Sequence, residues 1–215
     1  MMNEAQDVNK IRILIQPDRI SDDDICDLLH EAHQSTLDAG MHYSVLNQTG
    51  KDIRRRIGEN GVFFVAVDED DQPAGVLGVS FYEKSSAWYA KGKPYAEVKL
   101  GGVRQAYKGM GIYSMLLDAI YPYAFERVDV LTTNTAVQNT IIRKADEKRG
   151  WVYVDFVSWT ATDYYSVVMA KWKDTVPYNR AYCLLRYTWQ KCRTVILKNR
   201  SGQYRRAFEL MRHRR

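Results

Sequence analysis

A strand-like segment that runs through two closely spaced glycines into an apolar, helix-like run constrains this chain most. The strand-like segment covers Ala96 to Val103, the glycines are Gly109 and Gly111, and the apolar run covers Ile112 to Phe125. The first turn of a helix has backbone N–H groups without partners inside the helix, and the helix dipole adds partial positive charge there. Glycine has no Cβ, so an anion can approach the backbone closely. The stretch therefore predicts a phosphate-binding loop, to which Lys108 adds a full positive charge.

The glycine pair also fits a simpler interpretation. Glycines mark ordinary turns, and the two sharper phosphate patterns are absent: the chain has no Gly-x-x-x-x-Gly-Lys-[Ser/Thr] and no Gly-x-Gly-x-x-Gly after an early strand. Spacing alone leaves both a phosphate loop and a plain turn open.

The same stretch resembles the pyrophosphate loop of the GNAT superfamily of N-acetyltransferases. The pattern of that family is an apolar strand, then [Arg/Gln]-x-x-Gly-x-[Gly/Ala], then a helix. The matching residues of this chain are Lys108-Gly109-Met110-Gly111-Ile112-Tyr113. Gly111 matches the central glycine, Lys108 keeps the charge of the first position, and Tyr113 stands where a small residue is usual.

A second motif supports the resemblance. Family members usually carry an Asn before a helix, with Gly and an aromatic residue eleven and twelve positions later. Here Asn139 precedes Gly150 and Trp151 at those distances. Asp146 stands where the family often has a Tyr that acts as general acid. We expect Asp146 to be exposed on the helix and ionised near neutral pH, which makes it a poor acid.

The resemblance covers roughly Ile11 to Trp172 and implies a GNAT fold: a mixed, mostly antiparallel α/β sheet with helices on both faces. It implies transfer of an acetyl group from acetyl-CoA, the co-substrate, to a primary amine of a small molecule by direct attack in a ternary complex. An amino sugar is our leading guess, because Trp88 and Tyr89 could stack on a sugar ring and an acidic body suits a cationic amine. Two alternatives stay open: acetylation of a protein Lys or N-terminus, and a CoA-binding scaffold protein without catalysis.

The resemblance also implies which residues contact acetyl-CoA, and no metal is expected. Backbone groups at the end of the strand would bind the pantetheine arm, at Leu100, Gly101 and Val103. Asn139 would contact the same arm from the later helix. Backbone N–H groups of the glycine loop would hold the pyrophosphate, at Lys108, Gly109, Met110, Gly111, Tyr113 and Ser114.

Glu97 is the candidate general base, since family members often place a glutamate in this strand. A period of two puts Glu97 on the same strand face as Lys99 and Gly101. The alternative is a structural ion pair of Glu97 with Lys99 or Lys93. For the general acid, the candidates to replace the missing Tyr are Tyr164 and Tyr165 on the last strand. We select Tyr165, although a strand Tyr more often serves packing.

Composition sets the class of protein. With 215 residues and 46% hydrophobic residues, the chain is long and apolar enough for a globular domain with an appendage. The N-terminus is polar and acidic, without the pattern of a signal peptide, which predicts a cytoplasmic protein. Cys26, Cys183 and Cys192 are too few and too scattered for a disulfide framework or a zinc site, and we expect Cys183 and Cys192 to pack as small apolar side chains.

Charge is distributed unevenly along the chain. Residues 174–215 contain eleven Lys and Arg against two acidic residues, a net charge of +9, while the whole chain carries +5 and the remainder therefore −4. We predict two parts: an acetyltransferase domain over 1–173 and a basic helical extension over 174–215.

The extension has a helical apolar stripe at spacings of four, three and four, formed by Leu185, Trp189, Cys192 and Ile196. Such a stripe is more often core or a homodimer contact than a chemical site. The basic residues lie off the stripe, at Arg186, Lys191, Arg193 and Lys198. They are either simply solvated or meet an anionic partner or membrane surface, whereas nucleic acid is disfavoured because no recognised binding module is present.

The expected elements alternate strands and helices. Strands are expected over 11–16, 61–67, 74–82, 96–103, 128–133, 151–160 and 164–172. Helices are expected from Ser21 to near Gly40 and over 51–58, 112–125 and 137–149, followed by the tail helix and a short helix over 203–214. Pro122 should kink the 112–125 helix or end it early.

Overall fold

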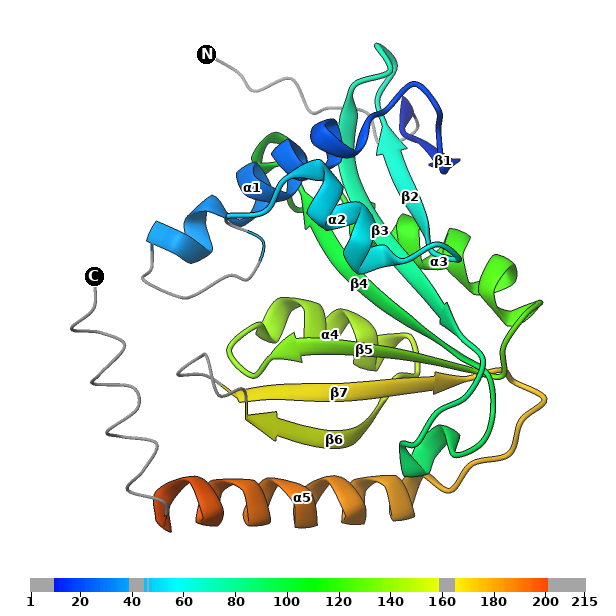
Figure 1. The fold of residues 1–215 in the computed structure, drawn as a ribbon, viewed down its shortest axis with the longest axis vertical. Coiled ribbons are helices and arrows are strands. Elements are labelled where there is room, and N and C mark those ends of the chain that lie inside the picture. Colours follow the sequence, from blue (N-terminus) through cyan, green and yellow to red (C-terminus); the bar gives the residue numbers. More distant parts are fainter. Residues whose placement is uncertain (1–9, 39–44, 46, 159–164, 201–215) are drawn as a thin grey trace. The chain divides into compact units, whose positions relative to one another are not determined.

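The structure, a computed structural model, describes residues 10–38, 45, 47–158 and 165–200. They form two compact units (Figure 1). Unit 1 comprises the described residues of 1–83 and 94–128, and unit 2 comprises those of 84–93 and 129–215.

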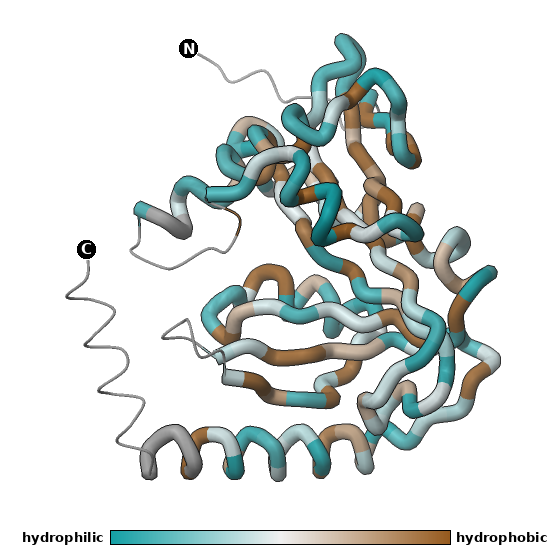
Figure 2. The backbone as a smooth tube through the Cα atoms, viewed as in Figure 1, coloured by the Kyte–Doolittle hydropathy of each residue, from teal (hydrophilic) through white to brown (hydrophobic). Residues whose placement is uncertain are grey.

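Unit 1 contains four antiparallel strands in sequence order: β1 (Arg12–Ile15), β2 (Val62–Val67), β3 (Pro73–Tyr82) and β4 (Tyr95–Val103). The predicted hairpin of β2 and β3 is confirmed. Its turn is held by Asp68, whose Oδ1 accepts from the backbone N–H groups of Asp70 (3.0 Å) and Gln72 (2.8 Å). Figure 2 shows how strongly hydrophobic residues concentrate in these strands.

Helices cover both faces of these strands, as the sequence predicts: α1 (Asp22–Asp38), α2 (Gly50–Ile57) and α3 (Ile112–Phe125). Neighbouring strand residues point to opposite faces of the sheet, so the contacts at Gly75 and Gly102 show which helix covers which face. A Cβ at Gly102 would lie 2.9 Å from Ala32 of α1. Gly75 pairs with Val103, the residue after Gly102, and so points to the other face, where a Cβ would lie 2.8 Å from Ile112 of α3. The predicted early end of α3 is wrong, because Pro122 falls in its last turn, where it removes a single helical hydrogen bond.

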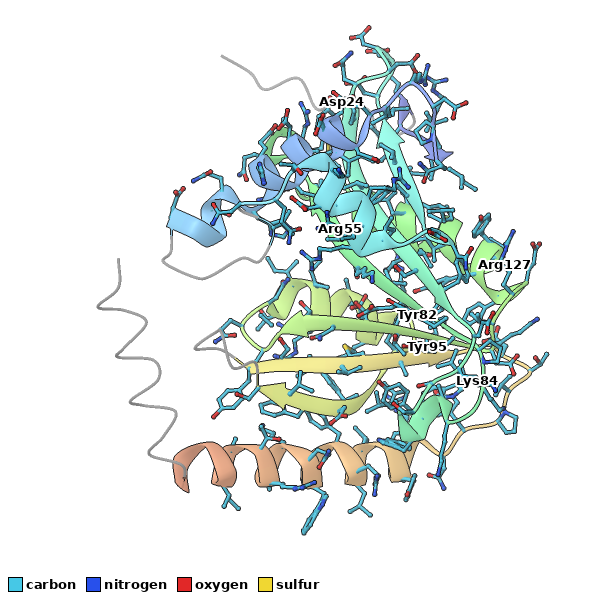
Figure 3. The ribbon with its side chains drawn as sticks, in the orientation of Figure 1. Asp24, Arg55, Tyr82, Lys84, Tyr95 and Arg127 are labelled. Atoms are coloured by element: carbon cyan, nitrogen blue, oxygen red, sulfur yellow. The ribbon has the colours of Figure 1, made fainter. Side chains whose placement is uncertain are left out.

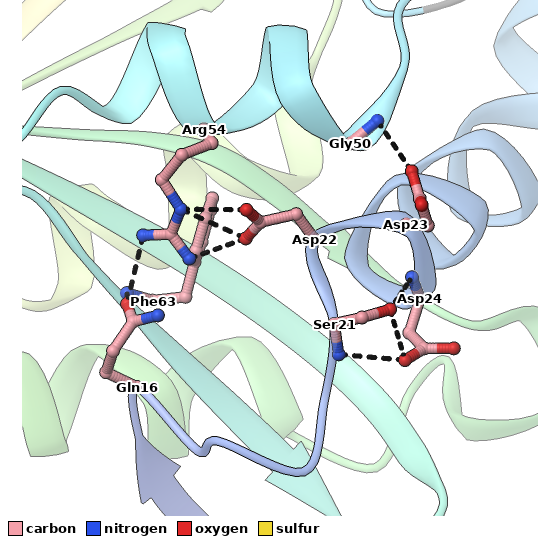
Figure 4. A network of polar contacts seen from close by, with 8 residues as sticks. All are labelled: Gln16, Ser21, Asp22, Asp23, Asp24, Gly50, Arg54 and Phe63. Atoms are coloured by element: carbon pink, nitrogen blue, oxygen red, sulfur yellow. Dashed lines mark hydrogen bonds and ion pairs between the residues drawn. The ribbon is translucent and has the colours of Figure 1, made fainter.

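The start of α1 is capped, as its Ser and acidic residues predict, and it is joined to α2 (Figure 4). Ser21 and Asp24 form reciprocal bonds, with Asp24 N–H donating to Ser21 Oγ (3.1 Å) and Ser21 N–H to Asp24 Oδ2 (2.8 Å). Asp22 accepts three bonds from Arg54, at 3.0 Å from Nε to each carboxylate oxygen and at 2.5 Å from Nη2 to Oδ1. Asp23 accepts from the first backbone N–H of α2 at 3.0 Å. These contacts fix the register of α1 against α2.

Unit 2 contains β5 (Val130–Ala136), α4 (Thr140–Lys148), β6 (Val152–Ser158), β7 (Tyr165–Trp172) and α5 (Arg180–Arg200), with a short 3₁₀ helix, η2 (Trp88–Ala90), from the 84–93 segment. The strand β7 lies between β5 and β6 and is antiparallel to both. The helix α5 runs along β6, where Thr194 Oγ1 donates to the Phe156 carbonyl (3.3 Å) and the Tyr187 ring lies 5.0 Å from Tyr153. The boundary expected between 173 and 174 stays a prediction, and the helix expected over 203–214 lies outside the described residues.

The interpretation of the α5 stripe as core is wrong. Leu185, Trp189 and Ile196 are 68%, 65% and 50% exposed, and Cys192 is exposed as well. The side toward β6 is instead formed by other residues, namely Cys183, Tyr187 and Thr194. A helix with apolar residues on two sides can bury either one, and periodicity does not decide which. Packing of Cys183 is confirmed, whereas that of Cys192 is wrong.

No helix in the described part of the chain is both long and apolar enough to cross a membrane.

Candidate active site

A β-bulge interrupts the end of β4. Lys99 pairs with Gly78 and Gly102 pairs with Val76, so two residues, Leu100 and Gly101, oppose the single residue between those partners. Leu100 has φ +53°, a conformation that non-glycine residues rarely adopt. A bulge breaks the ladder and redirects backbone groups, and strained backbone of this kind is frequent at functional sites. The predicted pantetheine contacts at Leu100 and Gly101 therefore fall on the irregular part of the strand.

The carbonyl of Gly101 is already engaged by α1. His33 Nε2 lies 2.8 Å from it, a contact that the sequence did not suggest. The pKa of His33 is lowered, mainly by burial. The bond to the Gly101 carbonyl raises this pKa in part, and the positive charge of Lys108 lowers it further. A neutral imidazole can donate its single N–H to the Gly101 carbonyl.

We expect His33 to make stability pH-dependent. Its pKa is lowered in the folded chain, so between that value and the ordinary 6.5 the unfolded chain binds more protons. Stability should therefore fall as the pH drops through 6.5 toward the folded value. In His33→Gln the side-chain amide can keep the bond to the Gly101 carbonyl without titrating. The Tm of this variant should therefore fall less between pH 7.5 and pH 5 than the Tm of the wild type. Parallel Tm curves for the two proteins would contradict this account.

The glycine loop has the geometry of an anion cradle. Gly109 and Gly111 have φ +85° and +79°, and no described atom lies within 4 Å of a Cβ built on either one. Gly111 is the N-cap of α3, and no side chain caps that end. The backbone N–H groups of Lys108 and Met110 donate within the loop, at 3.3 and 3.4 Å. The two glycines and the first turn of α3, which holds Tyr113 and Ser114, have a backbone geometry that fits a diphosphate.

Two side chains hold this loop in place. Tyr107 of η3 (Gln105–Tyr107) donates its hydroxyl to Asp68 Oδ2 at 2.5 Å, and this bond raises the pKa of Tyr107 to about 12. Lys108 Nζ donates to the Ala32 carbonyl of α1 at 3.2 Å. The loop is thus tied to the β2–β3 turn and to α1, where the Lys108 ammonium bonds.

Glu97 lies in a cluster of polar and aromatic side chains on one face of β3 and β4. Its Oε2 is 3.2 Å from Lys99 Nζ and accepts from the Tyr82 hydroxyl at 3.2 Å. Lys99 Nζ also donates to that hydroxyl at 2.9 Å, and the Tyr82 ring stacks on Tyr95 at 4.8 Å (Figure 3). The predicted shared face of Glu97 and Lys99 is confirmed, and so is the ion pair. Lys93 pairs with Asp129 instead, at 3.9 Å.

Three further candidates lie in unit 2. Asn139 is the N-cap of α4, where its Oδ1 accepts from the Ile142 N–H at 3.3 Å, so its amide nitrogen remains for another partner. Tyr165 begins β7 with its ring 5.1 Å from Phe156, while Tyr164 lies outside the described residues. The expected exposure of Asp146 is wrong: it is fully buried, and its carbonyl accepts from the Arg149 and Trp151 N–H groups at the end of α4.

The aromatic residues of the 84–93 segment face α5. The Trp88 ring is 5.5 Å from Tyr182 and 5.6 Å from Tyr89, and the Arg186 guanidinium lies 5.3 Å above it. Trp88 is therefore occupied by contacts within unit 2 and does not offer the free stacking surface expected for a sugar.

The two histidines within the described residues, His30 and His33, make separate contacts. His30 Nε2 is 2.9 Å from the Val45 carbonyl, whereas His33 contacts Gly101, and His42 lies outside the described residues. No group of three metal-ligating side chains occurs in the ranges that the structure describes.

The geometry agrees with the comparisons to known proteins. The family model described as "Acetyltransferase (GNAT) family" matches residues 23–151, which include the bulge, the glycine loop and the Asn139 motif. The chain belongs to this family. Its fold is therefore the predicted mixed α/β GNAT fold, and membership implies acyltransferase activity with acetyl-CoA.

Solved structures show the same fold at low sequence identity. A GNAT-family acetyltransferase from Streptococcus agalactiae has a TM-score of 0.60 and 16% identity, with 77% of this chain and 96% of that chain covered. NAA60 of Arabidopsis thaliana, in complex with a bisubstrate analogue, has a TM-score of 0.57 and 14% identity over 77% and 100%. A putative phosphinothricin N-acetyltransferase has a TM-score of 0.57 and 18% identity, with 75% of this chain and 98% of that chain covered. No curated protein matches the chain.

Proposed function

We propose that this chain is an N-acetyltransferase that acetylates a primary amine of a small molecule by direct attack in a ternary complex with acetyl-CoA. The observation that carries the proposal is the position of Glu97, three residues before the bulge at Leu100 and held by Lys99 and Tyr82. A carboxylate fixed beside redirected backbone groups can serve as base next to a reacting carbonyl.

Each proposed site residue has a separate role in the reaction. Acetyl-CoA supplies an activated acetyl thioester. The glycine loop binds its diphosphate through backbone N–H groups, and the bulge residues Leu100 and Gly101 orient the pantetheine arm, as does Asn139. Glu97 accepts the proton that the amine loses as its nitrogen bonds to the acetyl carbon. Tyr165 is the proposed donor of the proton that the departing thiolate takes up.

A pocket in unit 1 favours a small acceptor. It has a volume of about 380 Å³ and is lined by Asn60, Phe81, Tyr82, Glu83, Pro94, Tyr123, Arg127 and Val128. This volume falls within the usual range for small-molecule sites. Tyr82 both lines the pocket and bonds to Glu97, and the Glu83 carboxylate in the lining suits a cationic group.

The amino-sugar guess no longer has its main support, because Trp88 is covered by Tyr182 and Arg186. It stays one member of the acceptor panel. Acetylation of a protein Lys or N-terminus, and CoA binding without catalysis, are the competing functions.

The test is release of free CoA thiol by the purified full-length chain from acetyl-CoA and a panel of acceptors. The panel contains polyamines, amino acids, amino sugars, lysine peptides and peptides with free N-termini. Turnover that is highest with a small amine supports the proposal. A preference for peptides would replace it with protein acetylation, and CoA binding by calorimetry with no turnover on any acceptor would replace it with the scaffold function.

A further inference from the structure

One face of α5 is apolar, exposed and opposite the side that packs on β6. This outer face consists of Leu185, Trp189, Cys192 and Ile196, three of which are at least half exposed. At 100° per residue these four positions lie within about 60° of one another, directly across the helix from Thr194, which bonds to β6. Side chains project from α5 on the side away from β6 (Figure 3). A row of large apolar side chains including Trp marks a surface that binds something.

The charged side chains of α5 itself all have one sign. The sequence of α5 contains six Lys and Arg and no acidic residue. Arg193 is exposed about 70° from the centre of the outer face and Lys191 is exposed about 130° from it on the other side, whereas Arg186 lies over the Trp88 ring. The sequence that follows, 201–215, adds five Arg and one Glu. The helix α5 is therefore cationic, and so is the sequence that follows it.

We propose that the outer face of α5 binds an anionic membrane surface, with the helix lying in the plane of the headgroups. A helix with Trp and Leu on one side and Lys and Arg beside them matches interfacial helices, whose apolar side chains enter the acyl boundary while the cations meet anionic lipids. Trp is the side chain most typical of that boundary.

Charge disfavours the alternative occupants. In a symmetric homodimer, two copies of this helix would bring cationic flanks against each other, which is repulsive. The sequence of residues 201–215 has a net charge of +4, so this segment also lacks the negative charge that would complement the cations of α5. An anionic lipid surface satisfies both the apolar and the cationic part of the patch.

The test is flotation of the full-length protein with vesicles of phosphatidylcholine alone or with about 30% phosphatidylserine. We expect binding to the anionic vesicles only, and weaker binding at higher salt because exposed charges are screened. Leu185→Ser/Trp189→Ser should lower partitioning at least about tenfold, because the apolar contacts are lost. Lys191→Glu/Arg193→Glu should lower it by a similar factor, because each cation near an anionic surface adds to binding.

The matched control is Ile141→Ser, which changes an 80% exposed apolar side chain on α4 and should leave binding unchanged. Thermal unfolding and CoA calorimetry on every variant exclude misfolding as the cause. Two results would overturn the proposal: absence of binding to both vesicle types, and equal binding by wild type and both double variants. A dimer in analytical ultracentrifugation that dissociates in Leu185→Ser/Trp189→Ser would overturn it in favour of self-association.

Discussion

Glu97→Gln is expected to lower kcat by about two to three orders of magnitude while leaving the affinity for CoA unchanged. General-base catalysis by a positioned side chain is typically worth a factor of 10² to 10⁴, and glutamine keeps the size of glutamate but cannot accept the proton. Lys99 and Tyr82 can still donate to the amide oxygen, so the position of the side chain should persist. The measurements are steady-state kinetics with the best acceptor of the panel and calorimetry with CoA.

The control for Glu97→Gln is Glu59→Gln, which removes an exposed carboxylate from the turn before β2. It should leave both kcat and CoA affinity unchanged. If Glu97 serves only as a structural ion pair with Lys99, kcat will stay within about twofold of wild type, and stability will fall by no more than about 1 kcal/mol. That outcome would remove Glu97 as base and with it the main support for the proposed chemistry.

Gly111→Asp is expected to weaken CoA binding at least about 100-fold. The variant places a carboxylate at the start of α3, where its charge would repel a diphosphate. At an effective dielectric constant near 20, two like charges 4 Å apart repel by about 4 kcal/mol, more than a 100-fold change in affinity requires. Calorimetry with CoA measures the effect.

Gly111→Asn separates charge from shape in this experiment. Asn and Asp both tolerate the left-handed conformation and both cap helices, so the two variants should have similar stability. Gly111→Asn should bind CoA more weakly than wild type but more tightly than Gly111→Asp. Gly92→Asp makes the same change at another open glycine with positive φ, outside the loop, and should not alter binding. Normal CoA affinity in Gly111→Asp would show that the diphosphate does not rest on this loop.

The sequence determined the parts of this protein that depend on neighbouring residues. Residues 96–125 predict strand, glycine loop and helix, and the structure has β4, the loop and α3 there, because period-two burial, positive φ and helical periodicity are local properties. The shared face of Glu97 and Lys99 follows from the same strand period. The loop and Asn139 motifs together were specific enough to indicate the family that the comparison with family models then established.

The tertiary structure alone decided which surfaces meet. Asp146 is buried and His33 reaches Gly101 because distant segments pack there, sixty-eight residues apart in the second case. The bond from Tyr82 to Glu97 depends on the register of β3 against β4, which neither strand encodes by itself. The helix α5 has apolar residues on two sides, and the shape of the β6 surface selected Cys183 and Tyr187 for burial over Trp189. Periodicity shows that a helix has an apolar side, but the free energy of burial depends on which surface is available to cover it.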